Sequence, residues 1–377
     1  MVNISMDEAV NMNRTFINSS FFRRINNESL LESVCSNTGE CMYLFLVPVI
    51  SVFGIIGNAI SFKVFVCTSF SRPSSSVYLA ALSISDAGFL MALFSSWLGT
   101  GKLDVHFGQS IVYCYIILYV TYVCGFLSVW YVVLIMIERY IIVCHPLRVA
   151  SLCTKQRSYL SVGIVSLFAM LFYSHTFITS EVHSNSCSIA DDYINVVFVF
   201  TYIDTVITFV FPIIIVFILN IVVIISIRKF RKQQIVLSLQ ENQNVRMPPN
   251  TLSIAEVRIT SMLIVVSTMF LATNFPSHAI RVYIMLNSLL DKNTDHPEVT
   301  QAQQICNILY FCNFSINFLL YSASSKIFRK FLCISSNFGT LNCRNKSSEV
   351  RNNKYFVYSS ARNGRNTLVL VKRRLNH

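Results

Sequence analysis

Charged residues are scarce in this chain of 377 residues, where Asp, Glu, Lys and Arg together make up 13%. A soluble domain of this size has about a quarter of its residues charged. Hydrophobic residues, at 54%, are correspondingly abundant. This balance excludes a water-soluble globular fold and indicates a protein surrounded by lipid.

Motifs of catalysis are also missing. The seven histidines are scattered along the chain, and neither a zinc-binding HExxH nor a nucleophile GxSxG occurs. The sequence therefore predicts a protein that is not an enzyme and requires no cofactor. The apolar runs also contain no ring of like charges, no selectivity-filter segment and no repeated pair of broken helices, which disfavours a channel or transporter.

What the chain does contain is seven apolar stretches, each meeting the requirement of about 20 residues for a spanning helix. They cover residues 42–66, 77–98, 111–143, 159–179, 195–227, 259–286 and 305–323. We therefore predict an all-α membrane protein, folded as a seven-transmembrane helix bundle. A short amphipathic eighth helix is predicted next, because apolar residues between Ile327 and Leu332 fall on one face of a basic segment.

Lysine and arginine set the orientation of the bundle. The first 41 residues and the second, fourth and sixth loops carry five of them, whereas the other loops and the tail carry twenty-two. The positive-inside rule then places the N-terminus outside and the tail in the cytoplasm. The net charge of +12 follows from this topology, so no nucleic-acid binding is inferred from it.

The chain divides into three segments. Residues 1–41 carry four N-x-S/T sequons on the predicted outer side, which indicates a glycosylated extracellular segment. The predicted acceptors are Asn3, Asn13, Asn18 and Asn27. Residues 42–332 form the seven-transmembrane domain with its eighth helix, and the basic residues 333–377 are predicted to be a disordered cytoplasmic tail.

Polar side chains inside the spans are candidates for function, because placing them in lipid is costly. Asp86 and Asp204 stand out, since an ionised carboxylate inside the bundle needs a cation or a proton. The charged pair Glu138–Arg139 lies in the otherwise apolar run "IMIERYIIVCHPL". The competing interpretation, hydrogen bonds that join helices, is stronger for the asparagines and serines than for the two aspartates.

Short motifs follow one another across the spans. They are Gly57–Asn58, "LSISD" ending at Asp86, Cys114, "ERY" at 138–140 with "HPL" after it, Pro212, Pro276, and "NFSINFLLY" at 313–321 with "SSKIFRKFL" after it. In their order and spacing, over about residues 42–332, the chain resembles the rhodopsin-like class of G-protein-coupled receptors. The last two segments look most like those of invertebrate FMRFamide- and myosuppressin-type neuropeptide receptors.

The resemblance implies a multi-pass receptor of the plasma membrane. It would bind an extracellular ligand, most simply an amidated neuropeptide, and activate a heterotrimeric G protein. Arrestin and the lipid bilayer are implied as further partners. A receptor of the same fold for a non-peptide ligand, or a channel or transporter, is the alternative.

The resemblance also implies a cytoplasmic switch. Arg139 matches the arginine that holds the inactive state and contacts the G protein when freed. Glu138 can pair with it locally, and Glu256 matches its acidic partner on the sixth span. A static salt bridge is the alternative. The other switch positions are Tyr140, Asn317 and Tyr321.

Four polar residues match the sodium site of this class, and they are Asp86, Ser128, Asn313 and Asn317. An allosteric sodium ion would supply the positive charge that Asp86 needs, and oxygen ligands suit this hard cation. The alternative is a protonated Asp86 hydrogen-bonded to Asn58 and Asn317.

The resemblance pairs Cys114 with Cys187 in a disulfide that ties the second outer loop over the pocket, in an oxidising compartment. Cys35 and Cys41 also lie outside and form a second candidate pair. Cys333 follows the eighth helix and is a candidate for palmitoylation, with an inert thiol as the alternative.

The pocket residues argue against two ligand classes. The seventh span has no lysine for retinal, and Thr121 stands where amine receptors have an aspartate. The predicted ligand-binding residues are Thr121, Tyr122, Asp204, His278, Arg281, Gln303 and Asn307. With an acidic second outer loop, this pocket suits a basic peptide with an amidated aromatic end. Asp204 and Arg281 alternatively pair with each other, and both arrangements stay open.

Four family positions are altered in this chain. Asn274 and Gly163 replace tryptophans of the sixth and fourth spans, Phe318 replaces the seventh-span proline, and Asn220 replaces a fifth-span tyrosine. These changes leave the predicted fold intact, but the activation relay cannot be carried over from the family at these positions.

Overall fold

The computed structural model describes residues 38–67, 74–99, 111–183, 186–239, 254–289, 297–324, 328–329, 355–360 and 367–372. Residues 1–331 and 332–377 form two compact units, and each is described by itself.

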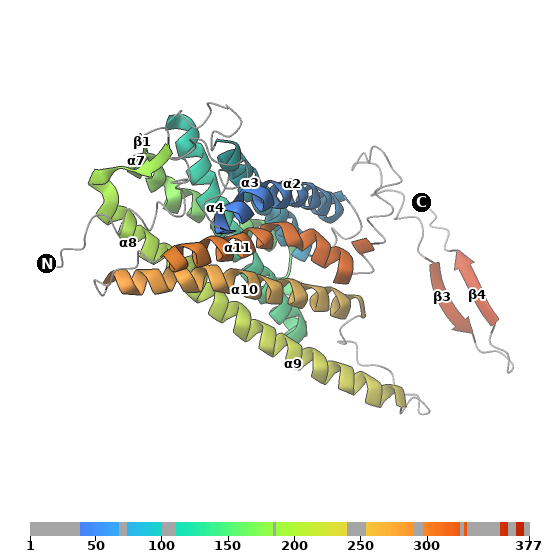
Figure 1. The fold of residues 1–377 in the computed structure, drawn as a ribbon. Helices are drawn as coiled ribbons and strands as arrows, with labels where there is room; N and C mark the ends of the chain where they lie inside the picture. Colours follow the sequence, from blue (N-terminus) through green and yellow to red (C-terminus); the bar gives the residue numbers. More distant parts are fainter. Residues whose placement is uncertain are drawn as a thin grey trace. The chain divides into compact units, whose positions relative to one another are not determined.

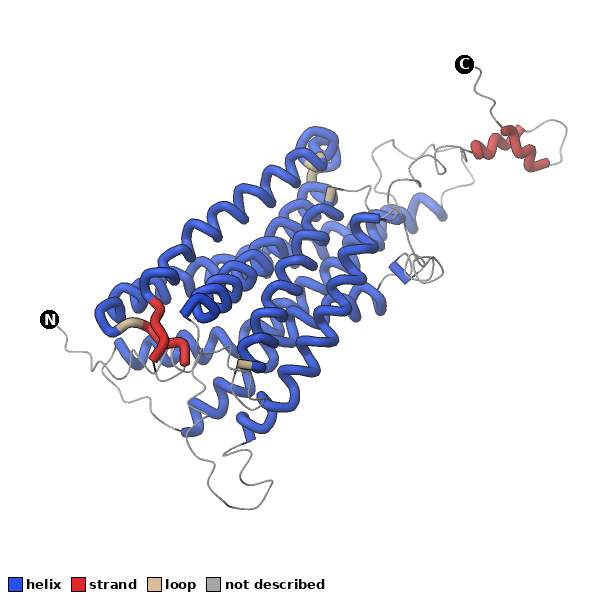
Figure 2. The backbone as a smooth tube through the Cα atoms, turned by 90° about the horizontal axis from the view of Figure 1, so that it is seen from above, coloured by secondary structure: helices blue, strands red, loops and turns tan. Residues whose placement is uncertain are grey.

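The first unit is a bundle of long helices (Figures 1 and 2). Seven segments of its described part are long and apolar enough to cross a membrane, which confirms the predicted spans. They are Met42–Cys67, Ser75–Leu98, Ile111–Cys144, Lys155–Thr179, Asn195–Gln233, Glu256–Asn287 and Glu298–Ser324. The limits agree with the prediction to within four residues, except that the fifth span ends six residues later and the seventh begins seven residues earlier.

The long helices of the spans follow one another along the chain. They are α2 (Thr38–Cys67), α3 (Ser75–Leu98), α4 (Ile111–Cys144), α6 (Lys155–Phe172), α8 (Ile194–Thr205), α9 (Phe211–Leu239), α10 (Ile254–Leu289) and α11 (Pro297–Ser324). Short helical turns link them, namely η4 (Pro146–Arg148), α5 (Val149–Leu152), η5 (Tyr173–His175), α7 (Thr176–Thr179), η6 (Asp191–Tyr193) and the π-helix η7 (Val206–Val210). The eighth helix is described only at Phe328–Arg329, which are helical.

An antiparallel hairpin that the sequence did not predict closes one end of the bundle (Figure 2). Strand β1 (Ser180–His183) pairs with β2 (Ser186–Ile189), so that Val182 lies opposite Cys187. This hairpin belongs to the predicted second outer loop.

The outside of the bundle is apolar. Side chains such as Val49, Leu160 and Ile225 are 60% or more exposed. A soluble protein would bury them, but in a bilayer they contact acyl chains and the helices keep every backbone group hydrogen-bonded. The surface pattern therefore supports the membrane assignment independently of span length.

Close helix contacts in the interior depend on two glycines of α2. A Cβ at Gly54 would lie 2.4 Å from the Leu90 side chain and 2.9 Å from the Ser315 Cα. A Cβ at Gly57 would lie 2.9 Å from the Phe318 Cβ. Only glycine lets α2 approach α3 and α11 this closely, and the stacked rings of Phe89 and Phe314, 3.8 Å apart, fill the core beside it.

Two segments differ from their predicted structure. Helix α9 continues to Leu239, beyond the predicted loop start at 228, because Arg, Lys and Gln are good helix formers and carry the helix past the membrane. In the second unit, β3 (Tyr355–Ser360) pairs antiparallel with β4 (Thr367–Lys372), within the segment predicted to be a disordered tail. The first strand is rich in aromatic residues and the second in β-branched ones, and they flank an Asn-Gly turn signal, which composition alone did not reveal.

Candidate functional site

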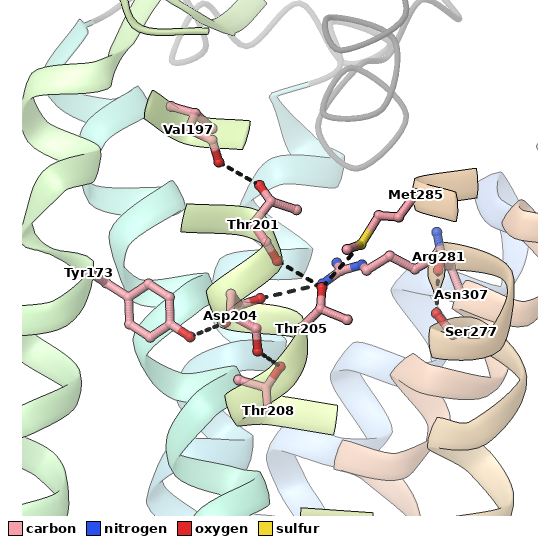
Figure 3. A network of polar contacts seen from close by, with 10 residues as sticks. All are labelled: Tyr173, Val197, Thr201, Asp204, Thr205, Thr208, Ser277, Arg281, Met285 and Asn307. Carbon is pink, nitrogen blue, oxygen red and sulfur yellow. Dashed lines mark hydrogen bonds and ion pairs between the residues drawn. The ribbon is translucent and has the colours of Figure 1, made fainter. Parts of the chain in front are cut away.

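A carboxylate with partners on two other spans lies near the end of the bundle that is predicted to be extracellular. Asp204 of α8 accepts a short hydrogen bond at Oδ1 from the Tyr173 hydroxyl. Its Oδ2 lies 3.4 Å from Arg281 Nη1 of α10, and both side chains are 13% exposed. Figure 3 shows these residues converging from the fourth, fifth and sixth spans.

The local fold of the fifth span positions this carboxylate. Directly after Asp204 the helix widens into the π-helix η7, a feature that occurs often at functional sites. Thr208 inside it donates to the Asp204 carbonyl oxygen at 2.7 Å, while Thr205 donates to the Thr201 carbonyl and contacts Met285 Sδ at 3.6 Å. The first two bonds fix the backbone within the fifth span, and the contact with Met285 joins this segment to α10.

The partner tyrosine is fixed by aromatic neighbours. The Tyr173 ring is stacked on Tyr122 of α4 at a centroid distance of 5.6 Å and stands edge-on to Phe126 at 5.8 Å. It is 2% exposed, so its hydroxyl cannot turn to water. Tyr173 was not among the predicted residues, because a tyrosine at the end of a span, with its apolar ring and polar tip, is only a weak signal for such a role.

The remaining predicted ligand-binding residues lie on α4, α10 and α11. Ser277 donates to Asn307 Oδ1 at 2.8 Å, and His278 stacks on Phe209 at 4.7 Å. His278 is buried and its Nδ1 has no partner within the described part of the chain. Thr121 donates to a carbonyl of its own helix at 2.7 Å, and Gln303 is buried.

The structure thus shows one of the two arrangements foreseen for the charged pair, with Asp204 and Arg281 joined to each other. Contact with a ligand stays a prediction for every member of the predicted set.

A second polar cluster surrounds Asp86, which is fully buried. Ser128 donates to its Oδ1 at 2.6 Å and Asn317 donates to its Oδ2 at 2.7 Å. Asn313 instead accepts from Thr273 at 3.2 Å. Two of the three predicted neighbours therefore contact Asp86 directly, and Asn58 does not support the alternative, because its amide donates to the Phe314 carbonyl.

The oxygens around Asp86 fit a hard cation. The two hydrogen bonds that the carboxylate accepts oppose the effect of its burial, and an ionised carboxylate in the bundle needs a compensating charge. Asp86, Ser128 and Asn313 would hold a sodium ion by their oxygens.

The residues of the predicted cytoplasmic switch are paired locally. Arg139 Nη2 lies 3.0 Å from Glu138 Oε2, and both side chains are almost fully buried. Glu138 also accepts a short hydrogen bond from Ser74 at the start of α3. Tyr140 shares a 3.2 Å hydrogen bond with His145. In the described part of the chain the ion pair recorded for Arg139 is with Glu138, and its contact with Glu256 stays a prediction.

The altered family positions have new partners. Ser267 of α10 donates to Asn220 of α9 at 2.7 Å, so this asparagine joins the fifth and sixth spans. Phe318 packs edge-on against Phe328 of the eighth helix at 6.1 Å. Asn274 donates to the Phe270 carbonyl of its own helix at 2.7 Å.

The structure describes only some of the residues for which a disulfide or a covalent modification was predicted. Cys114 takes part in a disulfide, and its Sγ lies 3.9 Å from the carbonyl oxygen of Glu181 in the outer hairpin. Pairing with Cys187 stays a prediction, because that side chain lies outside the described set. The same holds for Asn3, Asn13, Asn18, Asn27, Cys35, Cys41 and Cys333.

Comparison with known proteins adds the following. The family model described as "7 transmembrane receptor (rhodopsin family)" matches residues 57–321. The thyrotropin-releasing hormone receptor of Mus musculus is 25% identical over 339 residues, which are 82% of this chain and 81% of that receptor. The sex peptide receptor of Drosophila melanogaster is 24% identical over 335 residues, 81% of this chain and 75% of its own. The FMRFamide peptide receptor frpr-18 of Caenorhabditis elegans is 31% identical over 146 residues, 35% and 33% of the two chains.

Proposed function

Because the chain belongs to the rhodopsin family of seven-transmembrane receptors, we propose that it binds an extracellular peptide and responds by activating a heterotrimeric G protein. Similar proteins include receptors named for a sex peptide and an FMRFamide peptide. The receptor would lie in the plasma membrane with its N-terminus outside, as the distribution of lysine and arginine favours.

The observation that carries the proposal is the Tyr173–Asp204–Arg281 cluster. An acid and a cation 3.4 Å apart form a site without net charge. A carboxylate would meet repulsion from Asp204, and an ammonium would meet repulsion from Arg281. A terminal carboxamide has an oxygen for Arg281 and N–H donors for Asp204, so it can bind between them without stranding either charge. The stacked tyrosines beside the cluster suit an aromatic residue next to that carboxamide.

The cytoplasmic side supports coupling to a G protein. Leu147, in the short turn after α4, is 80% exposed although it is a large apolar residue. It lies in the turn directly after α4, and we propose that a protein partner covers it. We propose that the cytoplasmic end of the bundle beside Leu147 contacts the G protein once Arg139 is released from Glu138. We propose that arrestin binds the same face.

An allosteric sodium ion belongs to the same proposal. Bound by Asp86, Ser128 and Asn313, it would stabilise the conformation in which Ser128 and Asn317 are gathered around Asp86. Such an ion shifts the equilibrium only as far as it binds one state better than the other.

The test is nucleotide exchange in membranes from cells that express the full chain. A panel of peptides with aromatic C-terminal residues, each as the amide and as the free acid, is applied at matched receptor number. Exchange driven by an amide at least tenfold more potently than by its acid is expected. Asp204→Asn should reduce the amide's potency, while Tyr131→Phe, which removes a tyrosine hydroxyl bonded to Ser166 at 2.8 Å away from this cluster, is the control.

Two outcomes would contradict the proposal. One is ion current that needs no G protein, which would favour a channel. The other is exchange driven equally by amides and acids, which would leave the receptor function standing but remove the role given to the charge pair.

A further inference from the structure

The lipid-facing side of α9 is a continuous apolar stripe. Ile214, Phe217, Ile218, Ile221 and Ile225 recur every three or four residues, the period of one helix face, and each is at least 44% exposed. Apolar side chains in these positions contact acyl chains. The stripe therefore marks the side of α9 that faces the bilayer.

The opposite side of α9 faces the bundle. Val223 and Ile227 are buried and pack with Val143 of α4 in one apolar cluster. This contact fixes the rotation of α9 about its axis, and it places Ile227 beside the cytoplasmic end of α4, which ends at Cys144.

Three cations continue the lipid-facing stripe where the apolar residues stop. Arg228, Lys229 and Lys232 follow Ile225 at three, four and seven residues, so they lie on its face, and all three are exposed. Arg231 is exposed too, but it follows Ile227 by four residues and so continues the bundle side. The four cations of this turn therefore face two different directions.

The depth of these cations matches lipid headgroups. They lie one to two helical turns beyond Ile225. This is just beyond the level of Ile227, which packs against the end of α4. Here α9 emerges from the bilayer and continues past the end of α10 (Figure 1). Basic residues directly cytoplasmic of a span are attracted by anionic lipids of the inner leaflet.

We propose that Arg228, Lys229 and Lys232 form a binding face for a polyphosphoinositide headgroup of the inner leaflet. Three cations within one turn of helix present their donors to a single small anion of several phosphates, which one phosphatidylserine would not satisfy. By binding these side chains, the lipid would hold the cytoplasmic end of the fifth span at the inner leaflet. It would therefore act on the receptor from within the membrane. The proposal does not depend on the identity of the extracellular ligand.

Binding of dioctanoyl phosphatidylinositol 4,5-bisphosphate to the purified full chain tests this directly. The probe is titrated by microscale thermophoresis against the unchanged receptor, the triple variant R228Q/K229Q/K232Q and the single variant R231Q. The triple variant should bind roughly fivefold more weakly per cation removed, about a hundredfold in all. Arg231→Gln, the same chemistry on the other side of the helix, should change the Kd less than twofold. The basic tail contributes equally in every variant.

Four controls keep the result interpretable. The melting temperature of each variant shows that it is folded, and the conservative variant K229R/K232R should bind as the unchanged chain does. Dioctanoyl phosphatidylcholine should not bind. Inositol 1,4,5-trisphosphate should bind much more weakly than the lipid, because it lacks acyl chains to lie beside the isoleucine stripe.

Several results would overturn the proposal. Equal losses in R231Q and the triple variant would mean that the face is not selective. Equal binding of the free inositol phosphate would assign the site to a soluble anion. If the triple variant kept its lipid affinity but slowed nucleotide exchange in phosphatidylcholine discs, the cations would serve the G protein instead. Loss of peptide response without any change in these titrations would concern only the proposed function.

Discussion

Replacing Asp204 by asparagine should destabilise the receptor through the charge that it leaves behind. The change is nearly isosteric, and the amide oxygen can still accept the hydrogen bond of Tyr173, but Arg281 loses its counter-charge. At the observed 3.4 Å, an effective dielectric constant of about 20 gives an attraction of about 5 kcal/mol. Stranding one member of a fully buried pair costs about 3–5 kcal/mol. Since both side chains retain 13% exposure to solvent, we expect about 2–3 kcal/mol.

Two companion variants test whether the loss of stability comes from the uncompensated charge of Arg281. Arg281→Gln should cost less than Asp204→Asn, because Tyr173 still donates to the remaining carboxylate. The double variant leaves two neutral amides side by side and should lie within about 1 kcal/mol of the unchanged receptor, as replaced ion pairs often do.

Thermal unfolding of the four purified proteins in one detergent is the assay. A change of 1 kcal/mol shifts Tm by about 2–4 °C in proteins of moderate size, so Asp204→Asn should lower Tm by several degrees and the second substitution should restore most of it. Losses that simply add in the double variant would refute the reasoning, because independent sites add and coupled ones do not.

Three further predictions concern the other polar sites. Asp86→Asn should abolish the effect of sodium on agonist binding, which is contradicted if the unchanged receptor binds agonist equally in sodium and in an equal concentration of N-methylglucamine. Glu138→Gln should raise ligand-free nucleotide exchange more than Glu256→Gln does, because the structure pairs Arg139 with Glu138 at 3.0 Å; a larger rise for Glu256→Gln would show that the sixth span provides the main restraint. Burial raises the pKa of the Cys153 thiol to about 11, with Glu138 adding to the rise, so less thiolate is present at pH 7.4 and alkylation should be about tenfold slower than for an ordinary thiol. Rapid mass-spectrometric labelling of Cys153 at that pH would contradict this.

The spans could be predicted closely from the sequence because the signal is local. A window of about 20 apolar residues must cross the bilayer as a helix, whatever its neighbours do. The predicted span 111–143 and the observed helix Ile111–Cys144 differ by a single residue. The fifth span was placed less well at its inner end, since hydropathy reports where a helix leaves the membrane and not where the helix stops.

The candidate site was predicted by residue type but not by partner. Asp204 and Arg281 were both singled out, yet two arrangements stayed open because 77 residues separate them. Tyr173 was missed altogether, since a lone tyrosine at the end of a span carries little signal. The bond between Asn220 and Ser267 could not be foreseen for the same reason, as neither residue indicates the other.

The sequence by itself therefore determined the seven spans and the family, because hydrophobicity acts residue by residue on partition into the membrane. The tertiary structure decided which polar groups meet. A π-helix after Asp204, two glycines that let α2 close on its neighbours and the rotation of α9 set by Val223 and Ile227 fix these contacts. Such features depend on how helices pack against one another, and a rotation of one residue, about 100°, is enough to turn a side chain from the bundle toward the lipid.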